Sequence, residues 1–297
     1  MIEHRHGFNK LVVMCANHSR LVDDPEQGYT IERMLRIKSE HETAIARRRT
    51  RQELRDAQAS LSYARIVDEW EQRFSVDDWD ARMSPLVGDG HPRLAVEHFD
   101  TLQAGGSWLF DRVWPGTDRE LEGAFENFRV VLQDLLRVLE HHPHETLRES
   151  GLVALARFYN DPKYCRRPGV DHDLLDRWYD YYSALVEDLA FELTRAANLV
   201  CDTVRRRLDP RYRLEDGVVT ITQGPFMDFS FSRLRPHYVA GSGPTPYEGL
   251  SEFMTARATR DIVRGEGEPP EGLRLPRRGV SGSLVRHASR GRRQVSE

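Results

Sequence analysis

The segment DHDLLDRWYDYYSALVEDLAFELTRAANLVCDTVRRRL, residues 171–208, decides the fold. At about 100° per residue, its apolar side chains fall into two neighbouring stripes of one helix. The first stripe contains Trp178, Tyr182, Leu185, Leu189, Leu193, Ala196, Val200 and Val204, and the second contains Leu175, Tyr179, Val186, Ala190, Ala197, Cys201 and Leu208. The combined arc is too wide for one partner helix, so we expect the central helix of a bundle.

The opposite face of this helix is polar and predicts contact with solvent. Its residues are Asp176, Asp180, Glu187, Thr194, Asn198, Asp202 and Arg205. Phe191 lies at the centre of this face, where an exposed aromatic ring is unusual. Either another part of the chain covers Phe191 or a partner does, which makes it a candidate partner-binding residue.

A second strong helical pattern follows Thr117 and ends near His142, before Pro143. Its apolar residues have the alternating four- and three-residue spacing of helices packed in a bundle: Leu121, Phe125, Phe128, Leu132, Leu135 and Leu139. Before it, Gly105 and Gly106 are expected to end a short helix that starts near Leu94.

Residues 30–74 contain neither Gly nor Pro and predict one long helix. Its back half has a clear apolar stripe that we expect to dock on the bundle: Leu54, Ala57, Leu61, Ala64, Tyr63, Val67, Trp70 and Phe74. Its front half has a weak stripe only, followed by the polar run Arg47–Glu53. We therefore predict that the front half is a projecting arm, and that residues 1–29 before it are poorly ordered.

The arm has too little apolar area to be stable alone, since isolated helices are marginal in water. We expect it to bind a second copy of the chain or another protein, as in a coiled coil. The candidate partner-binding residues are Ile31, Met34, Leu35, Ile45, Arg47, Arg48 and Arg49. The arginines also allow contact with nucleic acid or an anionic surface, although nearby acidic residues reduce the positive field.

After Pro210 the apolar period becomes two, which predicts an antiparallel β-meander at residues 211–235. Its last strand has Met227, Phe229 and Phe231 on the buried face. The fold class is therefore mainly α: a helical bundle over residues 75–239 that includes the small β-meander. Residues 240–297 are expected to be a flexible tail, with seven Arg and no acid between Arg274 and Ser296.

Composition excludes several classes of protein. The 297 residues are 39% apolar and 30% charged with a formal net charge of −4, as expected for a globular protein with a polar surface. All but three of the 43 basic residues are Arg. No apolar run approaches the ~20 residues of a membrane span. The three Cys have no paired spacing, so we expect a reduced, cytoplasmic protein without disulfides.

The chain lacks the common motifs of phosphate-binding loops, zinc peptidases and serine hydrolases, and we predict no cofactor. His141, His142 and His144 are candidate metal ligands, but histidines also suit the end of a helix, which is the reading we prefer. Arg137 with His142, and Arg167 with His172, are candidate catalytic pairs at spacings that chance readily supplies. The sequence thus predicts a non-catalytic interaction or scaffold protein, with a helical nuclease or hydrolase acting on nucleic acid as the alternative.

Overall fold

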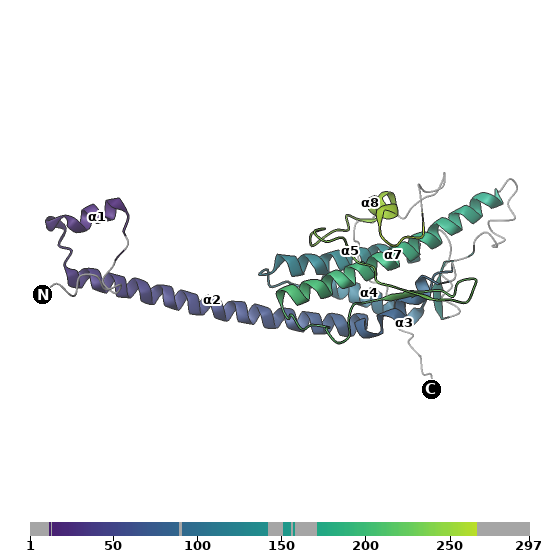
Figure 1. Ribbon diagram of the computed structural model, residues 1–297, viewed down its shortest axis with the longest axis horizontal. Helices are drawn as coiled ribbons and strands as arrows, with labels where there is room; N and C mark the ends of the chain where they lie inside the picture. The colour runs from purple at the N-terminus through teal and green to yellow at the C-terminus, as the bar shows by residue number, and fades with distance from the viewer. Residues whose placement is uncertain are drawn as a thin grey trace, which may run out of the picture. The chain divides into compact units, whose positions relative to one another are not determined.

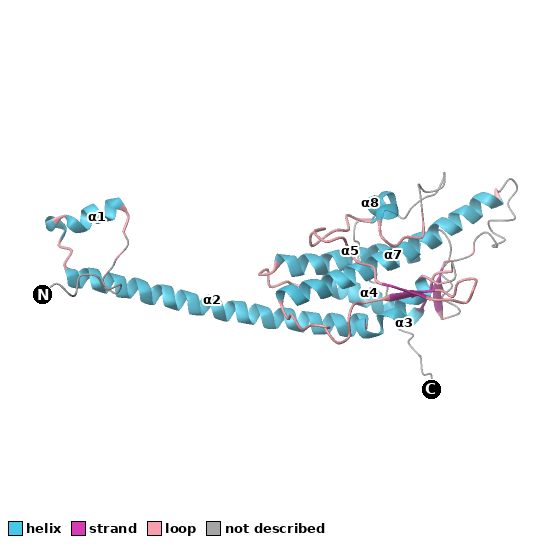
Figure 2. Cartoon of the chain, viewed as in Figure 1, coloured by secondary structure: helices cyan, strands magenta, loops and turns pink. Residues whose placement is uncertain are grey.

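The computed structural model of the chain describes residues 12, 14–88, 91–141, 151–155, 157 and 171–265. The chain divides into two units, residues 1–66 and 67–297. Helix α2 (Ile31–Phe74) begins in the first unit and ends in the second. The structure is mainly α-helical with two small antiparallel sheets, which confirms the predicted fold class (Figure 1, Figure 2).

The first unit contains α1 (Ala16–Asp23), the 3-10 turn η2 (Pro25–Gln27) and most of α2. Residues 16–27 therefore form regular structure where we expected poor order. The Asp24 side chain accepts a hydrogen bond from the backbone N–H of Glu26 at 3.0 Å and so fixes the start of η2. Thr30 starts α2 in the same way, because its hydroxyl accepts from the N–H of Arg33 at 3.2 Å.

In the second unit, α5 (Arg119–His141) and α7 (His172–Arg207) lie side by side, and α4 (Val96–Phe110) packs against α5 (Figure 1). The six residues of the predicted α5 stripe are all buried, which confirms that pattern: Leu121, Phe125, Phe128, Leu132, Leu135 and Leu139. Before α4 come short elements: η3 (Val76–Asp78), α3 (Trp79–Met83) and η4 (Ser84–Leu86).

An aromatic cluster joins the end of α2 to α5. Trp70 of α2 meets Phe125 and Phe128 edge-on, with ring centroids 5.8 and 5.5 Å apart. Phe74 packs on Phe128 at 4.9 Å. All four side chains are buried, so this contact anchors the end of α2. The stripe expected to dock is only half correct, because Leu54 and Leu61 are exposed and burial begins at Tyr63.

Both sheets are two-stranded hydrogen-bonded pairs (Figure 2). Strand β1 (Arg93–Ala95) pairs with β2 (Leu152–Ala154), with Leu94 opposite Val153. Strand β3 (Ile221–Gln223) pairs with β4 (Ser232–Leu234), with Thr222 opposite Arg233. Of the β-meander predicted at 211–235, the antiparallel pair β3–β4 is present, whereas its expected first strand is not, since residues 211–216 form consecutive turns.

The segment after residue 240 also differs from its prediction as a tail. Helix α8 (Leu250–Ala256) and the 3-10 turn η7 (Arg257–Thr259) follow β4. Five side chains here are buried: Tyr247, Leu250, Phe253, Met254 and Arg257. The segment up to residue 265 is thus packed on the rest of the second unit, because it carries apolar side chains of its own. The Arg-rich stretch from residue 266 lies outside the described residues.

Gly105 and Gly106 do not end a helix, because α4 continues through both. A Cβ at Gly105 would lie 2.5 Å from Cζ of Phe74, whereas one at Gly106 would make ordinary contact with Leu132 at 3.5 Å. Only the first glycine is therefore needed for close packing. Its missing side chain makes room for the buried Phe74 ring.

We predict that Gly105→Ala destabilises the protein by about 1–3 kcal/mol, because Phe74 must leave its position in a packed core. Gly106→Ala is the matched control and should change stability by less than about 1 kcal/mol, towards greater stability, since Ala favours helix. Urea unfolding followed by circular dichroism measures both values. Equal effects of the two substitutions would contradict the packing argument.

Candidate functional site

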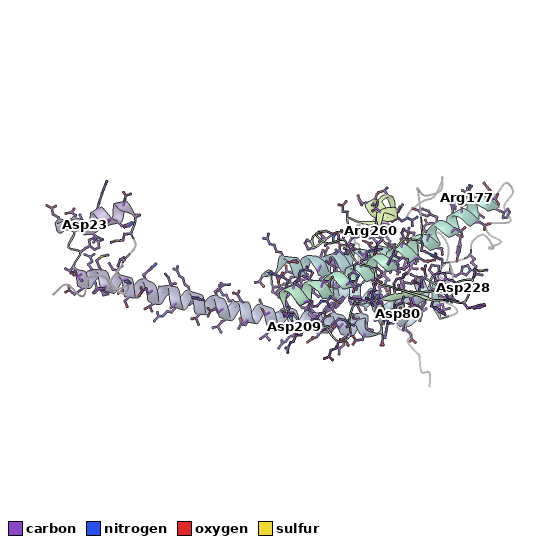
Figure 3. The ribbon with its side chains drawn as sticks, viewed as in Figure 1. Asp23, Asp80, Arg177, Asp209, Asp228 and Arg260 are labelled. Atoms are coloured by element: carbon purple, nitrogen blue, oxygen red, sulfur yellow. The ribbon has the colours of Figure 1, made fainter. Side chains whose placement is uncertain are left out.

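A cluster of charged side chains lies where residues 257–265, here called the strap, contact helix α7. The α7 members Glu187, Asp188, Glu192 and Arg195 are at most 3% exposed. The sequence predicted that the polar face of α7 is solvated. That prediction is wrong for Glu187, Thr194 and Asn198, which are buried, whereas Asp176 and Asp180 are exposed. The chain returns over the face after β4 and supplies partners for its charges. Figure 3 labels Arg260 of the strap beside α7.

Asp188 accepts three hydrogen bonds from the strap. Its Oδ2 accepts from Nη1 of Arg257 at 3.1 Å and from the backbone N–H of Gly265 at 3.2 Å. Its Oδ1 accepts from the backbone N–H of Arg264 at 2.5 Å. The Arg257 guanidinium also lies over the ring of Tyr181, 4.8 Å from the centroid. Asp188 therefore holds both ends of the strap.

Glu192 and Arg195 extend the cluster by one helical turn. Glu192 accepts from Nη1 of Arg195 at 3.0 Å and from Nη2 of Arg260 at 2.9 Å. Arg195 donates in turn to Asp261, from Nε at 3.0 Å, and to the carbonyl oxygen of Ile262 at 2.7 Å. Each charge thus faces an opposite charge, as burial requires.

The same face of α7 continues into a network of neutral hydrogen bonds. The Asn198 side-chain amide donates to the carbonyl oxygens of Val219 and Pro236 at 2.8 and 3.0 Å, and its oxygen accepts from the N–H of Val219 at 2.9 Å.

Phe191 is fully buried on this helix. It is therefore not a partner-binding residue in this structure, and the chain itself covers it.

Burial raises the pKa of Asp188 to about 6, and this effect exceeds the opposing effects of the Arg264 N–H and of Arg257. A raised pKa in a buried acid can indicate a general acid or base. Here both carboxylate oxygens are occupied by donors of the strap. Two surface hollows, of about 330 and 430 Å³, are lined by residues of other elements, chiefly α3 and α4. The cluster therefore acts as a clamp between the strap and α7.

The candidate catalytic and metal-binding residues are not brought together. Arg137 is paired with Asp134 at 2.7 Å, and His172 is exposed at the start of α7. His142, His144 and Arg167 lie outside the described residues, as does the side chain of His141, which ends α5. Within the described part of the chain, no group of three His, Cys, Asp or Glu side chains is arranged to hold a metal ion.

The predicted residues on the front half of α2 lie on one continuous helix. Ile31 is 78% exposed and Ile45 is 50% exposed, while Leu35 is also exposed and Met34 is half-buried. Arg47, Arg48 and Arg49 are exposed as well. Arg49 pairs with Glu53 at 3.1 Å, which weakens the local positive charge.

Sequence reasoning missed an apolar surface at the β3–β4 hairpin. Met227, Phe229 and Phe231 were expected on the buried face of a strand, yet they are 100%, 84% and 64% exposed. Residues 224–231 form the loop of the hairpin, here called the tip. Asp228 and Ser230, residues typical of turns, were the signals for a loop.

Comparisons with protein-family models, with curated proteins and with solved structures find no match to this chain. The function of the chain is therefore inferred from its own surfaces and side-chain chemistry. Among the described helices, none combines the length and apolar character that crossing a membrane requires. Several large apolar side chains of the described chain are exposed, and those of α2 and of the tip lie several to one element.

Asp188→Asn tests the clamp through its pH dependence. In the folded protein, the Asp188 carboxyl has a pKa of about 6 and is protonated below that pH. In the unfolded chain its pKa has the ordinary value of about 4, so it is protonated only below about pH 4. The contribution of this group to stability is therefore present at low pH and lost as pH rises through 6. We predict that, between pH 7 and pH 5, wild type gains about 1 kcal/mol relative to Asp188→Asn.

Thermal unfolding of both proteins between pH 5 and pH 7 measures this difference. Asp176→Asn, which removes an exposed carboxylate of the same helix, is the control for net charge. A constant difference between wild type and Asp188→Asn, or one that grows with rising pH, would show that Asp188 does not titrate as a buried acid.

Proposed function

We propose that this chain is a non-catalytic, cytoplasmic interaction protein, and that the front half of α2 is its partner-binding segment. The observation that carries the proposal is the exposure of Ile31, Leu35 and Ile45 along one helix. Exposed aliphatic side chains on a helix gain free energy when a second apolar surface covers them.

The polar run that follows these residues supports binding rather than burial within the chain. Residues 47–53 contain no apolar side chain, and all of them are exposed. Ion pairs at i,i+4, such as Lys38–Glu42 and Arg49–Glu53, stabilise the helix only weakly. An apolar partner would add the packing that this part of α2 lacks.

The sequence limits what kind of partner helix fits. Ile31 and Ile45 are two heptads apart, but Lys38 lies between them and Gln52 follows. The second series, Met34, His41 and Arg48, becomes polar after its first member. A long coiled coil is therefore not favoured, and the partner is proposed to be a second copy or another protein that covers about four helical turns.

The alternative of a nuclease or hydrolase gains no specific support. The best described candidate, Arg137, is 13% exposed and is engaged by Asp134, which also accepts a hydrogen bond from Tyr247 at 2.9 Å. A catalytic Arg would have to leave this pair to reach a phosphate. We retain the interaction protein as the single proposal.

The test is the triple substitution Ile31→Ser, Leu35→Ser and Ile45→Ser in the full chain. Because these side chains are exposed, we expect unchanged helix content and unfolding temperature, but loss of self-association or of the bound protein partner. Light scattering measures self-association, and affinity capture from the native cell with mass spectrometry measures partner binding. Removal of residues 1–51 should have the same effect and leave the second unit folded.

Val113→Ser is the matched control, since Val113 is an exposed aliphatic residue of the second unit. It should leave both readouts unchanged. The proposal would be overturned if the wild type is a monomer and captures the same proteins as the triple variant. It would also be overturned if the triple variant unfolds, because the three side chains would then be part of a core.

A further inference from the structure

The tip of the β3–β4 hairpin presents apolar side chains on a backbone that is already fixed. The N–H of Phe226 donates to the carbonyl oxygen of Ser230 at 3.0 Å, and the N–H of Phe229 donates to that of Phe226 at 2.8 Å. Asp228 accepts from the N–H and the hydroxyl of Ser230 at 3.0 and 2.6 Å. The loop is thus a closed turn that holds its side chains outward.

The backbone of the tip is also strained. Phe229 has φ 60°, a left-handed conformation that costs a bulky residue free energy and persists where the surroundings impose it. Gly224 permits the close approach at the base of the turn, because a Cβ there would lie 2.8 Å from the carbonyl oxygen of Ser230. Strained backbone is concentrated at functional sites, and here it holds an aromatic ring in solvent, which is typical of a binding surface.

The tip is too small for a stable protein interface. Its exposed apolar residues are Phe226, Met227, Phe229 and Phe231. Specific protein complexes bury about 20–30 residues on each side. A convex end with a few large apolar side chains instead suits shallow insertion into the boundary between lipid headgroups and acyl chains, where each side chain is buried without a shaped partner.

The charges around the tip favour an anionic lipid surface. Arg233 and Arg235 follow the tip and are exposed, and Asp228 is the only acidic residue between positions 217 and 247. The Asp80 carboxylate of α3 lies at the base of the hairpin, where it accepts hydrogen bonds from the N–H and the hydroxyl of Thr222. Near a surface of anionic lipid, each Arg adds to the attraction.

From these observations we infer that the β3–β4 tip inserts into the surface of anionic membranes, with Met227, Phe229 and Phe231 as the inserted side chains. This inference does not depend on partner binding by α2. Asp228 limits the depth of insertion, because its carboxylate stays with Ser230 at the level of the headgroups.

The first test is sedimentation of the full chain with vesicles of phosphatidylcholine alone and with vesicles that also contain about 30 mol% phosphatidylserine, an anionic lipid. We expect binding to the anionic vesicles, weaker binding to phosphatidylcholine, and about tenfold or greater loss in the triple variant Met227→Ser, Phe229→Ser, Phe231→Ser. Val239→Ser, also an exposed aliphatic residue near this hairpin in sequence, should bind as wild type does.

The second test is the sign of the effect of Asp228→Asn. Asn keeps the oxygen that accepts from Ser230 and removes the negative charge, so binding to anionic vesicles should strengthen by about fivefold. If the tip instead binds a protein through a cation opposite Asp228, the substitution weakens that complex and leaves vesicle binding absent. Circular dichroism of each variant establishes that the fold is intact.

The third test places the tip directly. In Met227→Trp, the new indole should shift its emission to shorter wavelength with anionic vesicles and be quenched by lipids brominated near the headgroup. Wild type, whose Trp residues lie elsewhere, is the reference for the difference spectrum. Absence of vesicle binding by wild type, or binding that the triple Ser variant retains, would overturn the inference.

Discussion

The buried charges of α7 are the constraint on which the second unit depends. A helix of 36 residues lies at its centre, with Glu187, Asp188, Glu192 and Arg195 removed from water. Unpaired, such charges would cost several kcal/mol each, so the α5–α7 pair is complete only when the strap supplies Arg257, Arg260 and Arg264. The strap is thereby held by electrostatics, while α8 before it contributes apolar packing.

Sequence periodicity predicted those parts of the fold in which one side of an element is apolar. The α5 stripe and the unbroken α2 are examples, because a 3.6-residue period and the absence of Gly and Pro are local signals. The burial of charges on α7 could not be predicted, since their partners lie 66 to 77 residues later in the chain. Gly105 is a similar case, because a helix tolerates Gly when a ring such as Phe74 occupies the space.

Of the two candidate surfaces, one was predicted from the sequence and the other was not. Exposure of Ile31 and Ile45 follows from a weak apolar pattern and was predicted, whereas the tip was mistaken for a half-buried strand. An alternating apolar pattern does not tell a strand from a turn whose rings point to solvent. The geometry of Asp228, Ser230 and Phe229 separates the two, and it is visible only in three dimensions. At the tip, the side chains project from a turn whose backbone is already fixed by hydrogen bonds.

The position of the strap in the sequence also affects the order in which parts of the protein fold during synthesis. During synthesis from the N-terminus, α7 leaves the ribosome before Arg257–Gly265 have been added. At about 5–20 residues per second, the interval between Arg207 and Gly265 is roughly 3–12 s. Throughout that time Glu187 and Asp188 lack their partners of the strap, and Glu192 has only Arg195 of the same helix, so this face of α7 stays in water. Closure of this face of the second unit is therefore a late event, set by the arrival of Arg257–Gly265.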